Sequence, residues 1–217
     1  MASINTNYGA SIALQNLNKT NSELERTQNR INTGMKVSSA KDSGAIFSIA
    51  TAQRATAASQ DAVRSGLQRS QSITDVALAA GDTITTALEE MKGLAVSIQA
   101  STAGSSAETS YLAEYNALSL EITSAISGAS FDGVNSLTTP LGVAGVTDVS
   151  GGSKARADAT TAKIDTAIST VTGALSTLGT QSKSLGRQIT FVNKYQDALE
   201  AGVGNLVDAD LAKESAK

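Results

Sequence analysis

Apolar residues recur at alternating steps of three and four along three stretches of the chain, a spacing typical of a helix that buries one face. In the first stretch one row, seven residues apart, is apolar and the row beside it is half polar. The apolar row consists of Ala10, Leu17, Leu24 and Ile31. This pattern predicts a helix over residues 5–32 whose narrow apolar stripe needs a partner along the Leu17 row.

The second stretch continues the same spacing through residues 45–98. A helix of about 55 residues would measure roughly 80 Å. Gly66, Gly81 and Gly93 interrupt it, and they either weaken the helix or mark the close approach of a neighbouring helix. The core positions expected in this stretch are Ile49, Val63, Ile73, Ile84, Met91 and Ile98.

A third, shorter apolar pattern predicts a helix over 106–128. Asp132-Gly133 between apolar residues, followed by a stretch rich in Gly and β-branched residues, predicts one or two short β-hairpins at about 129–153. The last stretch has the most regular spacing, and its expected core positions are Ile164, Ile168, Val171, Leu175, Leu178, Leu185, Ile189, Val192 and Leu199. Its length matches the second stretch, so the two are expected to pair antiparallel.

The join between the first two helices, RINTGMKVSSAKDSGAIFSIA at 30–50, contains signals for a helix end and a new start. Gly34 suits the left-handed residue that ends a helix, and the stretch from Ser39 to Asp42 supplies side-chain oxygens that begin one. Met35, Val37 and Phe47 are too apolar for a free linker. We therefore expect the connection to pack against another surface.

The amino-acid composition disfavours several classes of function but says less about the fold. The 217 residues are 41% hydrophobic and 3% aromatic, without Cys, His or Trp. Without Cys and His the chain has no thiolate nucleophile, no Cys or His metal ligand and no histidine to act as the usual general base. Lys and Arg total 17 against 20 for Asp and Glu and are scattered singly, which disfavours nucleic acid as a partner. No apolar run is long enough for membrane insertion.

Four segments together resemble bacterial flagellins. NTGMKVSSAKDSGAIFSIA is similar to the family's N-terminal signature SGLRINSAKDDAAGLAIA. The resemblance continues through LEEMKGLAVSIQAS, FDGVNSL and LGRQITFVNKYQDALEAGVGNLVDADLAKESAK, and so covers almost the whole chain. It implies a structural subunit of the flagellar filament, located outside the cell and exported without a cleaved signal peptide. Its implied partners are other flagellin subunits, in a homopolymer or a mixed filament, and a flagellar export chaperone.

Two departures from the family pattern bear on the site. Asp42 is followed by Ser43 where the family usually has a second acidic residue, so one helix-capping charge is missing. Flagellins also continue past the Asp208-Ala209-Asp210 motif into a helix that pairs with the N-terminal one. We therefore expect this chain to be truncated, and its first helix to be disordered or held by another molecule.

The expected fold class is mainly α: an elongated antiparallel helical bundle or coiled coil with a small β-hairpin region. The domains are a terminal helix at 1–33, of the type that forms the inner tube, a connection at 34–44 and a helical core domain at 45–217. The resemblance assigns subunit-interface roles to Leu14, Leu17, Leu24, Ile31, Met35, Val37 and Phe47. The alternative for these residues is a core within one molecule.

Two carboxylate pairs, Glu89-Glu90 and Asp208 with Asp210, have the residue types of an acid–base dyad. Neither accompanies a pocket-forming pattern, and solvated helix faces explain such pairs. The sequence thus predicts no catalytic residue, no metal ligand, no cofactor and no enzymatic activity. The alternative function is a secreted coiled-coil junction or adaptor protein, which would share the spacing but depart more from the SSAKD segment.

Overall fold

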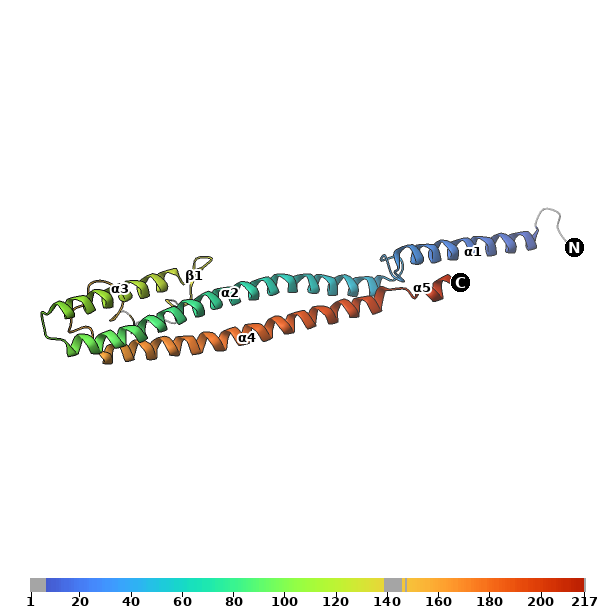
Figure 1. Cartoon of the computed structure of the whole chain (residues 1–217). Coiled ribbons are helices and arrows are strands. Elements are labelled where there is room, and N and C mark those ends of the chain that lie inside the picture. Colours follow the sequence, from blue (N-terminus) through green and yellow to red (C-terminus); the bar gives the residue numbers. More distant parts are fainter. Residues whose placement is uncertain (1–6, 139–145, 147, 217) are drawn as a thin grey trace. The chain divides into compact units, whose positions relative to one another are not determined.

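The computed structural model describes residues 7–138, 146 and 148–216. Within this part of the chain the elements are α1 (Tyr8–Thr33), α2 (Gly44–Ala100), α3 (Ser106–Gly128), β1 (Ser130–Phe131), β2 (Val134–Asn135), α4 (Thr161–Val207) and α5 (Leu211–Ser215) (Figure 1). The predicted class, a mainly α antiparallel fold with a small hairpin, is confirmed. The chain forms two compact units: unit 1 is Met1–Val63 with Val192–Lys217, and unit 2 is Arg64–Phe191. The expected division into domains at residues 33–45 stays a prediction.

One hairpin is present among the described residues. Ser130 pairs with Asn135 and Phe131 with Val134, antiparallel, leaving a two-residue turn. Such turns need positive φ at both central residues, and Asp132 (φ 51°) and Gly133 (φ 75°) supply it. Most of the second expected hairpin, residues 139–145 and 147, lies outside the described residues.

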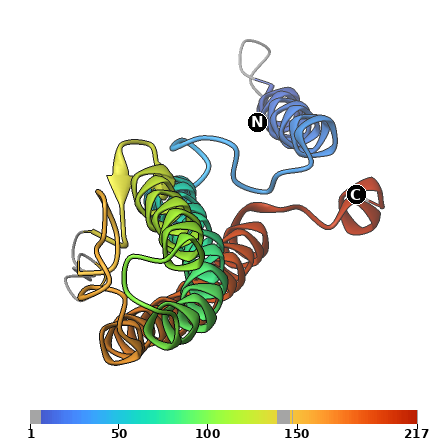
Figure 2. The same ribbon diagram turned by 60° about the vertical axis from the view of Figure 1, so that its left-hand side comes forward.

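The main core belongs to unit 2, where α3 and α4 pack against α2 (Figures 1 and 2). Large apolar side chains from all three helices are fully buried there, among them Ile84, Met91, Ile122, Ile164 and Leu178. Lys92 Nζ lies 2.6 Å from Asp165 Oδ1. Gly81 of α2 faces Leu175 of α4, whereas Lys92, further along α2, faces the earlier residue Asp165. The two helices therefore run antiparallel, as the matched spacing predicts.

The three glycines of α2 differ in their surroundings. A Cβ at Gly81 would overlap Leu175 Cδ2, whereas Gly66 and Gly93 have open space where a Cβ would stand. Close helix approach therefore explains Gly81 alone of the three.

The chain returns from the hairpin to α4 along α3. Gly151 N donates to Ser119 O, and the Asn116 side chain accepts from Lys154 N at 2.6 Å. Further along, Arg156 donates to Gln99 O at 2.7 Å and to Glu108 Oε1 at 3.1 Å. These bonds fasten the return segment to the start of α3 and the end of α2.

Unit 1 has a smaller core, made of Val37, Ala50, Val203 and Val207. The predicted core positions Ile49 and Val63 are wrong, because their side chains are 49% and 46% exposed. Here α2 buries the small residues Ala50 and Ala57 instead. The reason is that α3 belongs to unit 2, so a narrower face of α2 is covered in unit 1. The other expected core positions of α2 and α4 are buried or half-buried.

Candidate assembly surface

Helix α1 presents its apolar row to solvent. Its first turn is capped by Asn7, whose side chain accepts from Ala10 N at 3.1 Å, and it ends at Gly34 with φ 68°. None of its residues is buried. The expected interface residues on this helix, Leu14, Leu17, Leu24 and Ile31, have exposed fractions between 41% and 59%. The face that the sequence marks as needing a partner therefore remains uncovered in the isolated chain.

The last turns of α1 contact the short helix α5. Arg30 Nη1 donates to Glu214 Oε1 at 3.2 Å, and Glu214 is buried. Asp210 starts α5 by accepting from Lys213 N. The expectation of a disordered first helix is thus not met over Tyr8–Thr33, which forms a regular helix with one end held inside the chain.

The start of the connection between α1 and α2 is hydrogen-bonded to the end of α4 and the residues after it. Lys36 N donates to Val207 O at 2.7 Å, and Ala209 N donates to Gly34 O at 2.8 Å. This short antiparallel bridge ties the residues after α1 to the end of α4. The connection is a packed joint, as its apolar composition predicts.

Asp42 organises this joint but does not cap α2, which corrects the sequence interpretation. Its Oδ2 accepts from the backbone N–H and hydroxyl groups of Ser38 and Ser39 at 3.0–3.1 Å. The Ser39 backbone N–H is the main reason that the pKa of Asp42 lies below its ordinary value. Ser43 Oγ accepts from Ile46 N in the first turn of α2. The residue that departs from the family pattern is therefore itself the cap.

The interface role expected for Val37 stays a prediction, and in the isolated chain this residue is buried. Its side chain is 5% exposed and packs in the unit 1 core, where Phe47 lies half-buried against it. Met35 is half-buried and pairs its backbone with Asp208. The burial of Val37 beside Val203 and Val207 of α4 favours the alternative interpretation, a core within one molecule.

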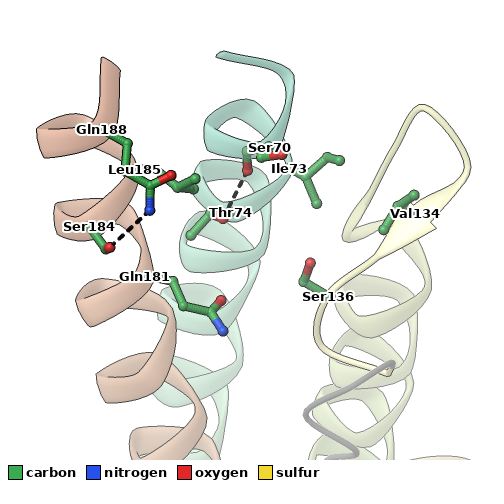
Figure 3. A pocket seen from close by; sticks show the side chains of 9 residues that line it. All are labelled: Ser70, Ile73, Thr74, Val134, Ser136, Gln181, Ser184, Leu185 and Gln188. Carbon is green, nitrogen blue, oxygen red and sulfur yellow. Dashed lines mark hydrogen bonds between the residues drawn. The ribbon is translucent and has the colours of Figure 1, made fainter. Parts of the chain in front are cut away.

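The hollow drawn in Figure 3 has none of the groups that acid–base catalysis needs. It measures about 410 Å³ and lies between α2, α4 and β2, where Ile73, Val134 and Leu185 meet Ser136, Gln181 and Gln188. Its lining, drawn entirely from described residues, contains no ionisable side chain. The Glu89 and Glu90 side chains are exposed on α2.

Among the described residues, no cluster of three or more carboxylate, imidazole or thiol groups stands close enough together to hold a metal ion. No helix in this part of the chain has the length and hydropathy needed to cross a membrane.

Sequence reasoning missed two polar contacts that help to fix the helices. Gln196 is a polar residue within the apolar spacing of the last helical stretch, and its side chain is buried and donates to Asp61 Oδ1 at 2.9 Å. Arg156 joins Glu108 to the end of α2. A polar residue at a core position hinted at the first contact. Nothing in the spacing pointed to the second, because Arg156 lies in an irregular segment.

Comparison with known proteins assigns the chain to a family. The model of the bacterial flagellin N-terminal helical region matches residues 4–139, and that of the flagellin C-terminal helical region matches 161–217. Flagellin FljM of Caulobacter vibrioides is 48% identical over 99% of this chain and 88% of the relative. A flagellin of Brucella melitensis is 35% identical over 100% and 89%. Flagellin C of Rhizobium meliloti is 27% identical over 100% and 90%.

These matches cover both helical regions and agree with the helix order and the FDGVNSL hairpin of the structure. They also agree with the uncovered apolar row of α1, which suits a protein that works in contact with other molecules. The chain belongs to the bacterial flagellin family and is a structural subunit of the extracellular flagellar filament.

Proposed function

We propose that α1 is the element through which this flagellin assembles, and that the seam between α2 and α4 is the subunit's own core. The observation that carries the proposal is the exposure of Leu14, Leu17, Leu24 and Ile31 on a helix that buries no residue. Most of the apolar positions of α2 and α4, in contrast, are already covered within the molecule.

The exposed row is a source of association energy. Full burial of a Leu or Ile side chain contributes about 1.5–3 kcal/mol, so covering four half-exposed side chains contributes several kcal/mol per contact. A contact between different patches on successive copies does not close on itself and therefore propagates as a helical lattice. Other flagellin subunits, identical or paralogous, are the partners that offer such a patch at every step.

A flagellar export chaperone is the second partner in the proposal. An apolar stripe left uncovered in the monomer invites non-specific association before the subunit reaches the filament. A chaperone that covers the Leu17 row would prevent this and would have to leave before assembly. In this proposal the same exposed stripe binds the chaperone before export and other flagellin subunits in the filament.

The test replaces two exposed leucines of the α1 row with polar residues and leaves the buried core unchanged. Leu17→Gln with Leu24→Gln is expressed from the natural gene in cells that lack other flagellins. We expect short or absent filaments by electron microscopy and secreted monomer in the medium, because export continues while elongation fails. The purified double variant should keep the wild-type thermal unfolding midpoint.

The matched control is Val96→Gln with Leu120→Gln, which alters two apolar side chains, each 56% exposed, on α2 and α3. These variants should leave filament length near that of the wild type. Filaments of normal length from the α1 variant would contradict the proposal. So would a loss of unfolding temperature in that variant, since it would place the row in the molecule's own core.

A further inference from the structure

The hairpin turn joins Asp132 to Gly133, and the sequence contains no other Asp-Gly or Asn-Gly pair. Asp132 is also the one described non-glycine residue with a positive φ, 51°. L residues adopt this left-handed conformation at a cost in energy. Its carboxylate side chain is 58% exposed. A strained backbone, an unhindered following residue and open access to water thus coincide at one peptide bond.

We propose that Asp132-Gly133 is a site of spontaneous covalent modification, at which the aspartate passes through a cyclic succinimide to isoaspartate. The nucleophile is the backbone nitrogen of Gly133. Glycine carries no Cβ to hinder the approach of this nitrogen to the Asp132 side chain. None of the turn and loop hydrogen bonds between backbone groups of the described residues is donated by the Gly133 N–H, so ring closure breaks none of them.

The reaction needs neither a cofactor nor an oxidant. The Gly133 nitrogen forms a bond to Cγ of Asp132, the C–OH bond of the neutral carboxyl group breaks, and the amide proton leaves with the hydroxyl as water. Water then adds to one of the two ring carbonyls. Opening at Cγ restores aspartate. Opening at the backbone carbonyl carbon leaves the chain running through Cβ and Cγ with a free α-carboxylate. The product has the mass of the starting chain.

Arg69 restrains this reaction. Its Nη2 lies 2.5 Å from Asp132 Oδ2, and this contact must be given up when the carboxyl group turns toward the Gly133 nitrogen and loses one oxygen as water. Both side chains are more than half exposed. Exposed pairs of this kind are weak, so the restraint slows the conversion and does not abolish it.

Conversion would loosen the hairpin. An isoaspartyl residue adds one backbone atom to a two-residue turn and moves the carboxylate to a different carbon. The pairing of Phe131 with Val134 depends on that turn, and the contact with Arg69 depends on the original carboxylate position. The hairpin also carries Val134 and Ser136, which form one wall of the hollow in Figure 3.

The experiment follows isoaspartate in the folded full-length chain. Protein is incubated at a mildly acidic pH and digested in mild acid, and isoaspartyl peptides are separated and identified by electron-transfer fragmentation. Because every other aspartate precedes a bulkier residue, we expect Asp132 to convert about tenfold faster than any of them.

Variants separate the site from its restraint. Asp132→Glu keeps the charge but disfavours ring closure, and should abolish the product at this position. Arg69→Gln should accelerate conversion about two- to fivefold, the effect of one surface ion pair. The matched control is Arg187→Gln, which removes an exposed arginine of α4. An isoaspartate level at Asp132 no higher than at other aspartates would overturn the site. Equal rates in the two arginine variants would overturn the role of Arg69.

Discussion

Helices α1 and α3 are similar in length, 26 and 23 residues, and each begins with a side-chain cap, but only α3 has its apolar stripe covered within its own chain. Helix α3 buries Tyr115 and Ile122 completely against α2 and the return segment. Helix α1 buries nothing and leaves its leucines exposed. The difference shows that an apolar stripe reports the need for a partner without saying which molecule supplies it.

Truncation of one apolar residue on each helix should separate the two cases most strongly. Ile122→Ala removes a buried side chain and should lower the free energy of unfolding by about 2–5 kcal/mol. Leu24→Ala removes an exposed one and should change it by no more than about 0.5 kcal/mol. Urea unfolding of the monomer followed by circular dichroism measures both. Equal losses would mean that α1 has a hidden partner within the chain.

The glycines of α2 sharpen the same contrast inside a single helix. At Gly81 the added methyl of alanine would meet Leu175, so Gly81→Ala should destabilise the fold by about 1–3 kcal/mol through overpacking. Gly93 faces open space, so Gly93→Ala should stabilise the helix by up to about 1 kcal/mol. Thermal unfolding of the two variants provides the comparison. The same sign for both would show that Leu175 moves away freely.

Spacing alone predicted the helices well because their lengths exceed any uncertainty at the ends. The helix expected at 106–128 is Ser106–Gly128, and the long second and fourth stretches became α2 and α4. The positions of α4 were identified as core because one apolar stripe there meets one partner. On α2 the same reasoning placed Ile49 and Val63 in the core. The prediction failed at these two residues because the width of the buried face depends on how many helices pack against it. The spacing of apolar residues does not give that number.

The residues proposed for assembly show the same limit of sequence reasoning. The exposed leucines of α1 could be predicted because an amphipathic helix is a local pattern. Val37 was assigned to an interface although it belongs to the unit 1 core, since its position depends on the bridge between Lys36 and Val207. Ser38 and Ser39 donate hydrogen bonds to Asp42, and all three residues are close in the sequence. The sequence could not show whether Asp42 would hold the joint or cap α2, because that depends on the residue at which α2 begins.

The smallest expected effect concerns the carboxylates beside the two helices, and it depends on pH. At the start of α3 the N–H of Gly104, followed by Arg156, holds the pKa of Glu108 below its ordinary value of 4.5. In the joint after α1 the Ser39 N–H lowers the pKa of Asp42 from 3.8. A lowered folded-state pKa contributes stability that is fully present above the unfolded value. That stability is lost as the pH falls through the folded value.

Below the ordinary values of 4.5 and 3.8, the two carboxylates should therefore fail in different ways. Glu108 joins α2, α3 and the return segment, so its protonation should lower the urea midpoint of the whole chain, and Glu108→Gln should remove that part of the pH dependence. Asp42 holds only the joint. Its protonation should speed hydrogen exchange at the Ser38 and Ser39 amides, after correction for the intrinsic rate, with little change in the midpoint, and Asp42→Asn should show fast exchange at every pH. If protonation of Asp42 lowered the urea midpoint as much as protonation of Glu108, the joint after α1 would unfold cooperatively with α3. The contrast between α1 and α3 would then be confined to the apolar row of α1.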